Sequence, residues 1–405
     1  MQVQVDPPVA VGCSLSRQQV RPLTSASSAH LDLIRAAAAW AVMWGHLRAL
    51  FFVDFQHLEH RNKLLSALYL LTGFAHQAVM VFFVLSGFLI SSAIIKRHVS
   101  GTWSWRDYSI DRSSRLYVVL IPGLLFGLLW DKAGSSLFAS TGLYTRPLDG
   151  FGFAIARDGI TVGNFVGNLF FLQTIACPTF GSNGPLWSLA NEFWYYVLFP
   201  VALSAGIAWV NKSLQRAIPL TVLMIVVAIF VGYQILTGFF IWMAGVALVL
   251  AYSRFTIRPH GWLLPTYLLI SIAVLVSCLT AVRAGSPSWL GGDFAVGIAF
   301  TLFLFGILQI DLGIRHTYYP RIAHVLAGFS YSLYVLHFPL LLFLRAWASS
   351  AQRWQPDVAH LWYGALVGTI VLSFAWMVSV VTENRTRSVR NWIRNAIPPF
   401  GDQSG

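Results

Sequence analysis

The stretch LDLIRAAAAWAVMWGHLRALFFV, residues 31–53, decides the fold of this chain. It is long enough to cross a bilayer, because about 20 apolar residues in a helix span the hydrocarbon core. It nevertheless carries Arg35 and, ten intervening residues later, His46. At about 100° per residue these two side chains fall roughly 20° apart on one helix face, separated by roughly 16 Å along the axis.

Ionisable side chains inside a membrane are costly and usually face a cavity or a partner, so Arg35 and His46 are candidates for function. In the alternative interpretation, Arg35 extends toward the lipid headgroups and His46 makes a structural hydrogen bond. The other motifs of the chain are needed to choose between the two.

The composition is that of a protein with many membrane spans. Of the 405 residues, 57% are hydrophobic and 10% are charged, whereas about a quarter are charged in soluble proteins. The net charge of +12 comes from basic residues scattered through the loops, which favours cytoplasmic loops over a nucleic-acid partner. Cys13, Cys177 and Cys278 have neither metal-ligand nor disulfide-framework spacing, so no metal is expected.

Hydrophobic runs separated by polar or Pro/Gly breaks predict an all-α polytopic membrane protein with about ten transmembrane helices. A tight turn around Gln234 separates the fifth run from the sixth, and these two could be divided differently. The predicted spans are residues 31–53, 75–95, 114–130, 186–209, 217–233, 236–252, 262–282, 294–311, 325–345 and 361–382.

Ten spans place both termini on the same side of the membrane. The tails and the even-numbered loops hold roughly twice as many Lys and Arg residues as the odd-numbered loops, so we expect both termini in the cytoplasm. Residues 1–30 contain no run of signal-peptide length and are predicted to be a cytoplasmic tail. Residues 31–382 would form one transmembrane domain and residues 383–405 a short basic cytoplasmic tail. The one long external loop, residues 131–185, contains a predicted re-entrant or interfacial piece at 163–175.

Two arginines end the predicted cytoplasmic loop KRHVSGTWSWRDYSIDRSSR, residues 96–115. Arg112 and Arg115 are spaced i, i+3 on one face of a helix start, where they can clamp an anion through forked hydrogen bonds. Basic residues that simply hold the loop inside and bind lipid phosphate would have the same spacing.

An acidic residue lies within the fourth predicted span, GPLWSLANEFWYYVLFP at residues 184–200. Ser188 and Glu192 are spaced i, i+4 and share a helix face. A carboxylate at this depth requires a partner or water, which favours a functional role. The alternative is an interfacial capping acid beside an aromatic belt.

A polar stripe marks the ninth predicted span, FSYSLYVLHFPLLLF at residues 329–343. Ser330, Tyr334 and His337 follow the spacing i, i+4, i+7, which suits either a functional face or a hydrogen-bonded contact between helices.

Two further motifs favour structural roles. Ser86 and Gly87, in FFVLSGFLI at residues 82–90, are small residues that let helices approach closely, and we expect them to bring the second span against the first. Glu383 follows the last span beside basic residues and is predicted to be a boundary acid.

Five of these motifs together resemble the acyltransferase-3 family of integral-membrane acyltransferases. That family has an Arg-x10-His pair in the first span, FFxxSGFLI in the second, an Arg-x-x-Arg loop, PLWSLxxE in the fourth span and SYSLYxxH in a late span. All five occur here in the family order, from about Leu31 to Glu383. The chain departs from the family at Phe193, where a second acid often follows Glu192, and at Leu116, which follows the arginine motif without an early proline.

The resemblance implies transfer of an acyl group, usually acetyl, from cytoplasmic acyl-CoA to a hydroxyl of a glycan, a lipid-linked sugar or another acceptor outside the cytoplasm. It implies that His46 is catalytic and that Arg35, Arg112 and Arg115 are essential, and these arginines suit the anionic acyl-CoA. A bacterial inner (plasma) membrane is the natural setting. No permanently bound cofactor is expected, since acyl-CoA is a substrate.

The chemistry of the residues leaves two routes open for His46, general base or nucleophile on the thioester. A carboxylate such as Glu192 could fix its tautomer. The competing class is a proton-coupled transporter that uses the buried His, Glu and Arg as a relay, but the chain shows no internal repeat. Possible acceptor-binding or supporting residues are Ser86, Ser188, Tyr334 and His337.

Overall fold

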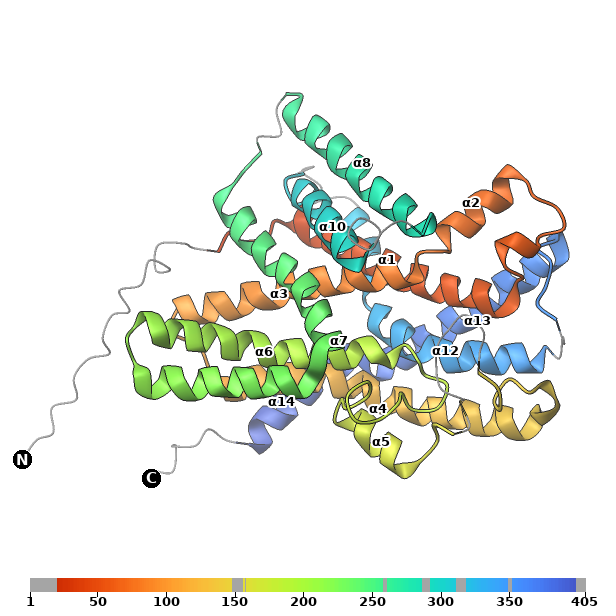
Figure 1. Cartoon of the computed structure of the whole chain (residues 1–405), viewed down its shortest axis with the longest axis horizontal. Helices are drawn as coiled ribbons and strands as arrows, with labels where there is room; N and C mark the ends of the chain where they lie inside the picture. Colours follow the sequence, from red (N-terminus) through yellow and green to blue (C-terminus); the bar gives the residue numbers. More distant parts are fainter. Residues whose placement is uncertain are drawn as a thin grey trace, which may run out of the picture.

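The fold is a bundle of long helices (Figure 1), seen in a computed structural model that describes residues 20–147, 156, 158–257, 261–285, 292–310, 318–348 and 352–397. Over these ranges the regular secondary structure is helical, apart from isolated β-bridges that join Phe52 to Trp354 and Gln173 to Cys177. The all-α prediction is therefore confirmed.

Every predicted hydrophobic run contains a helix, although the boundaries shift. The fifth and sixth runs form two legs of α7, which meet at Gly232 with the left-handed φ of 74°. The ninth run is divided between α11 and α12, which are bent by 44°. The helices that correspond to the predicted runs are α1 (Ser25–Phe51), α3 (Ala75–Val99), α4 (Trp105–Leu137), α6 (Leu186–Val210), α7 (Leu214–Arg254), α8 (Leu263–Arg283), α10 (Asp293–Ile307), α11 (Tyr319–Ala327), α12 (Ser330–Trp347) and α13 (Val358–Val381).

In the described part of the chain, six helices are long and apolar enough to cross a membrane, or seven when the bent pair α11 and α12 counts as one span. The chain is thus a multi-pass membrane protein, while the number of ten crossings and their orientation stay predictions. α1 is not among the six because its polar side chains lower its hydropathy. It packs against α3, α11, α12 and α13 instead, so the helix that carries Arg35 and His46 lies within the bundle.

Small residues set the closest helix crossing, but the partner differs from the prediction. A Cβ atom at Gly87 of α3 would lie 2.0 Å from the carbonyl oxygen of Trp242, and one at Gly245 would lie 2.2 Å from that of Val84. Gly87 therefore brings α3 against α7, and the predicted approach to α1 at this position is wrong. The contact of α3 with α1 lies at Gly45, where a Cβ would be 2.7 Å from that of Ala75.

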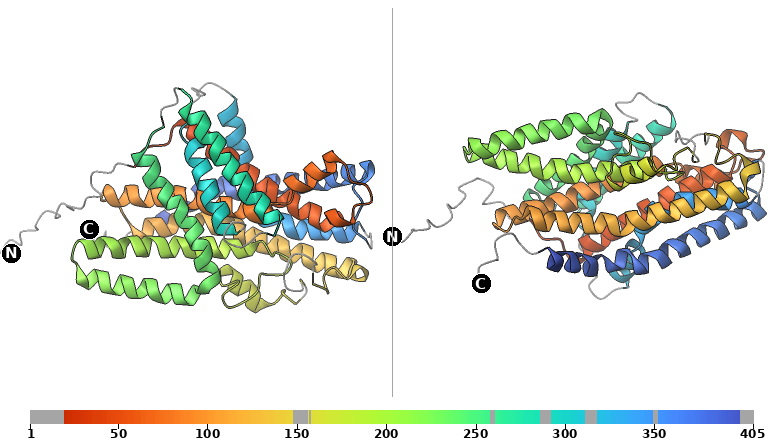
Figure 2. Two further views of the ribbon diagram at one scale, coloured as in Figure 1. Left: turned by 45° about the horizontal axis from the view of Figure 1, so that its top comes forward. Right: turned by 90° about the horizontal axis from the view of Figure 1, so that it is seen from below.

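The second leg of α7, α8 and α10 cross the rest of the bundle at a steep angle (Figure 2). Three short helices lie outside the predicted spans: α2 (Lys63–Leu71), α5 (Val162–Leu169) and α14 (Thr386–Ala396). α5 falls in the piece expected at 163–175. α14 falls in the predicted tail and docks on α4, because Arg394 donates to the buried carboxylate of Asp111 at 2.9 Å. Residues 383–397 are therefore packed structure.

Candidate functional site

Two histidines from α1 and α12 form the centre of the site. Nδ1 of His46 lies 2.7 Å from Nε2 of His337, and the two ring planes differ by 6°. Nδ1 of His337 lies 2.8 Å from the carbonyl oxygen of Tyr334 and 3.0 Å from that of Leu333. A carbonyl only accepts, so Nδ1 of His337 carries the proton and its Nε2 accepts from Nδ1–H of His46. In a neutral His46 the lone pair is therefore on Nε2.

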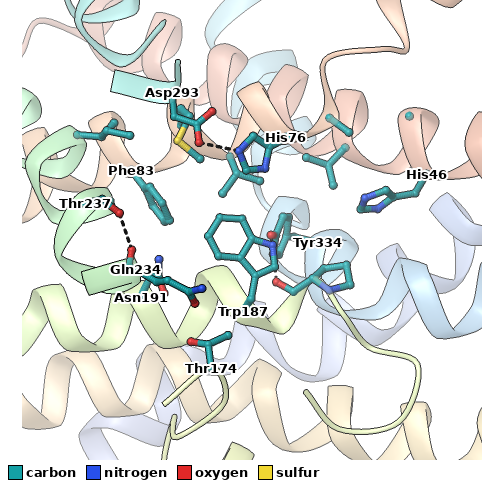
Figure 3. Close-up of a pocket in the computed structure, with 18 of the residues that line it drawn as sticks. His46, His76, Phe83, Thr174, Trp187, Asn191, Gln234, Thr237, Asp293 and Tyr334 are labelled. Carbon is teal, nitrogen blue, oxygen red and sulfur yellow. Dashed lines mark hydrogen bonds and ion pairs between the residues drawn. The ribbon is translucent and has the colours of Figure 1, made fainter. Parts of the chain in front are cut away.

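A cavity of about 640 Å³ opens beside His46 (Figure 3), and we call it the His46 cavity. Its walls carry polar and aromatic groups from α3, α6, α7 and α10. Nε2 of His76 lies 2.8 Å from the carboxylate of Asp293, and the His76 ring stacks on the indole of Trp187 with centroids 5.8 Å apart. Asn191 also lines this space. The volume is in the range of small-molecule sites.

A second, narrower cavity of about 100 Å³ lies toward the start of α1, and we call it the Arg115 cavity. It joins residues that are far apart in sequence. The predicted site residues that line it are Arg35, Ser86, Arg115, Ser188, Glu192, Ser330 and Tyr334.

Three side chains, Val79, Phe83 and Tyr334, line both cavities and form the boundary between them. The hydroxyl of Tyr334 is hydrogen-bonded to that of Ser188 at 2.6 Å and donates to the carbonyl oxygen of Pro185 at 3.1 Å. Since His337 is one helical turn beyond Tyr334 on α12, the histidine pair lies next to this boundary. Tyr334, held by Ser188, is thus part of the wall between the cavities.

The carboxylate of Glu192 belongs to the Arg115 cavity. It accepts a short hydrogen bond from Tyr196, whose hydroxyl also lies 3.4 Å from that of Ser86. Arg115 interacts electrostatically with both Glu192 and Tyr196. The described hydrogen-bond partner of His46 is His337 instead, so the ring that orients the candidate catalytic nitrogen is a histidine.

Of the three arginines of the predicted acyl-CoA site, Arg35 and Arg115 line the Arg115 cavity and Arg112 does not. The side chain of Arg115 is exposed and lines the cavity. Arg35 lines the same cavity and is held by Asp32 at 3.1 Å. Arg112 does not line this cavity, because its guanidinium is held 6.0 Å and 5.9 Å from the ring centroids of Tyr108 and Tyr196. The expected fork of two adjacent arginines is therefore not formed around this space.

Glu383 has the structural position that the sequence predicts. One of its oxygens accepts from the backbone N–H and from the hydroxyl of Ser332, at 3.0 Å each. The carboxylate thus caps the first turn of α12, directly after the bend that follows α11. It also interacts electrostatically with Arg115 and Arg35.

His76 and Asp293, which lie 217 positions apart, are not among the site residues that the sequence predicts. Each is an ionisable residue at the start of a predicted span, and this signal was present in the sequence. Their pairing needs the arrangement of α3 and α10, which no local pattern contains. In the part of the chain that the structure describes, no group of three His, Cys, Asp or Glu residues is arranged to hold a metal.

Residues 28–380 match the acyltransferase-3 family, described as an acyltransferase domain. The match covers nearly the whole chain, so the chain belongs to this family. It is a membrane acyltransferase by family and fold. Comparisons with curated proteins and with solved structures found no match.

Proposed function

We propose that this protein moves an acyl group, most simply acetyl, from cytoplasmic acyl-CoA to a hydroxyl of a glycan or lipid-linked sugar outside the cytoplasm, in the bacterial inner membrane. The observation that carries the proposal is the pair of cavities separated by Tyr334, with His46 lining one of them beside this boundary. A transfer reaction between substrates on two sides of a membrane needs two entries that meet at one reactive group.

The Arg115 cavity suits the donor. With both termini in the cytoplasm, the start of α1 and therefore Arg35 and Arg115 lie in the cytoplasmic half of the bundle. A narrow passage takes a pantetheine arm better than the nucleotide, and its arginines can pair with anionic oxygen. Arg112, on the same helix as Arg115, then lies nearer the mouth, where the nucleotide phosphates would be bound.

His46 supplies the reactive nitrogen. As a base, Nε2 takes the proton of the acceptor hydroxyl while that oxygen attacks the thioester carbonyl, the C–S bond breaks, and the proton leaves with the CoA thiolate. As a nucleophile, the same Nε2 attacks the carbonyl, the C–S bond breaks and the CoA thiolate leaves. The acceptor oxygen then attacks the acyl group, the bond from Nε2 to the acyl carbon breaks, and the hydroxyl proton passes through the freed Nε2 to the thiolate. In both routes His337 positions the ring by accepting from Nδ1–H. The enclosing helices exclude water that would hydrolyse the thioester.

The test compares purified wild-type protein with His46→Gln in lipid nanodiscs, using release of the CoA thiol from acetyl-CoA in the presence of a glycan panel. General base catalysis is worth about 10²–10⁴-fold in rate, so His46→Gln should lose at least that factor. It should still bind acetyl-CoA, because the arginines are unchanged. Near-wild-type turnover would remove His46 from the mechanism, and net solute flux without thiol release would favour the proton-coupled transporter.

A further inference from the structure

A third cavity lies next to the His46 cavity. It has a volume of about 630 Å³, and we call it the Arg283 cavity. Its lining comes from α1, from the segment 54–57 with the carboxylate of Asp54, from α2 with Tyr69, and from the end of α8 with Arg283. Arg48 lines both this cavity and the His46 cavity. An acceptor whose hydroxyl lies at Nε2 of His46 would therefore have Arg48 within its reach, at the start of the neighbouring cavity.

The two arginines are held at this junction without a carboxylate partner among the described residues. Arg283 donates to the carbonyl oxygen of Tyr69 at 2.7 Å and lies 5.2 Å from the ring centroid of Phe74. Gly73 has no side chain to displace it, since a Cβ there would meet the guanidinium. Arg48 lies over the ring of Tyr69 at 5.0 Å, and its buried Nε makes no hydrogen bond in the described part of the chain.

The local charge is unbalanced. Arg48 is repelled by both Arg283 and Arg353, and the carboxylate that acts on Arg48 is that of Asp54. Asp54 is already bound by both terminal nitrogens of Arg353, at 3.2 Å and 2.7 Å. Burial raises the pKa of Tyr69, so its hydroxyl stays neutral and adds no negative charge. Arg48 is half-buried and Arg283 is exposed to the cavity. A half-buried guanidinium beside a second one, with its nearest carboxylate already paired, favours the binding of an anionic ligand.

We propose that Arg48 and Arg283 bind an anionic group of the acceptor, a phosphate or a carboxylate on a sugar, while a hydroxyl of the same molecule lies at His46. The inference rests on the proposed function and narrows the acceptor to an acidic or phosphorylated saccharide. The guanidinium fork matches both anions. A phospholipid headgroup presents the same chemistry, so the experiment separates the two sources.

The probes are glucose 1-phosphate, methyl glucuronide and neutral methyl glucoside, titrated by calorimetry into the full-length protein in phosphatidylcholine nanodiscs. The two anionic sugars should bind at least about tenfold more tightly than the neutral one. Arg48→Gln and Arg283→Gln should remove most of that difference. The matched control is Arg146→Gln, which removes an exposed arginine of the predicted external loop and should change nothing.

Arg48→Lys and Arg283→Lys keep the charge and guard against a folding defect. Both should bind the anionic sugars a few-fold more weakly than wild type, because a lysine cannot make the fork. Equal binding of anionic and neutral sugars by wild type would overturn the proposal, as would unchanged anion binding in the folded Lys and Gln variants. A lipid control replaces part of the phosphatidylcholine with phosphatidylglycerol. If sugar binding is then lost, and if wild type retains this lipid while Arg48→Gln does not, the site binds a lipid headgroup. That result would also overturn the proposal.

The same preparations are titrated with acetyl-CoA. Binding of acetyl-CoA without preference for anionic sugars would reject the acceptor subsite and leave the acyltransferase function standing. Absence of acetyl-CoA binding and of thiol release would reject the proposed function, whatever the sugars do.

Discussion

His46 and His337 have different positions in one hydrogen-bonded chain, and this difference makes their roles separable. Nδ1–H of His337 donates to two carbonyl oxygens of its own helix, α12. These two bonds therefore decide that His46 is the donor and His337 the acceptor in the bond between the two rings. His337 lies outside the His46 cavity and is fully buried. In the proposed mechanism it is a positioning residue, and its effect on activity would pass through the His46 ring.

Substitutions at His337 should follow the ability to accept a hydrogen bond. His337→Leu removes the acceptor for Nδ1–H of His46 and should lower kcat by about 10²-fold, near the lower limit for acid–base catalysis. His337→Gln keeps a carbonyl acceptor and should lose about tenfold or less. The KM for acyl-CoA should stay unchanged in both, and the pH dependence of kcat/KM should change in His337→Leu alone. Equal rates for the two variants would contradict a positioning role.

Arg115 and Arg112 should differ in their effect on the donor, although they are three residues apart. Arg115→Lys should raise the KM for acyl-CoA by about tenfold, because a lysine loses the forked hydrogen bonds inside the narrow cavity. Arg112→Lys should raise it less, since the Arg112 side chain lies against Tyr108 and Tyr196. Steady-state kinetics at saturating acceptor measures both. A larger effect at Arg112 would mean that the donor phosphates, and not the arm, dominate binding.

At the scale of the helix, the crossing of α3 and α7 depends on the absence of two side chains. Gly87→Ala would put a Cβ against the Trp242 carbonyl, which can move only with the backbone of α7. We expect a loss of about 1–3 kcal/mol of stability, as for other overpacked cores, read as a lower thermal unfolding midpoint in detergent. Gly206→Ala on α6 is the control, because no atom lies within 4 Å of its added Cβ. Equal midpoints for the two variants would disprove the tight crossing.

The sequence predicted the helices well and their neighbours poorly. Long apolar runs form helices in lipid because each backbone group must find its partner within the segment, so the runs coincide with helices. The turn around Gln234 was recognised, but its geometry depends on a left-handed Gly232. No local pattern predicts α14, because its position depends on Asp111, more than 270 residues earlier.

The candidate site was predictable to a similar degree. Charged and polar side chains are costly in lipid, so their presence on apolar helices marks candidate site residues. This pattern predicts Arg35, His46, Arg115, Glu192 and His337. Which of them meet is a property of helix packing, so the sequence suggested Glu192 as the partner of His46 while the structure pairs His46 with His337. The surplus charge of Arg48 and Arg283 likewise appears only when α1, α2 and α8 are assembled.

At the scale of the whole molecule, the orientation in the membrane can be measured with single cysteines in a background without Cys13, Cys177 and Cys278. Thr102 and Thr145 are both exposed and lie in the two loops that flank α4. With both termini in the cytoplasm, Thr145→Cys should react with a membrane-impermeant maleimide on intact cells, and Thr102→Cys only after lysis. The reverse labelling pattern would mean that the protein has the opposite orientation in the membrane. The assignments of the donor and acceptor cavities would then be exchanged.

The boundary of Tyr334, Val79 and Phe83 has a consequence for the cell if the proposed function holds. The two cavities would then open to opposite sides of an energised membrane, and a leak through this boundary would dissipate the proton-motive force. The hydrogen bond between Tyr334 and Ser188 would in that case also act as electrical insulation. Such an enzyme would have to pass an acyl group between aqueous compartments while its resting conductance stays negligible.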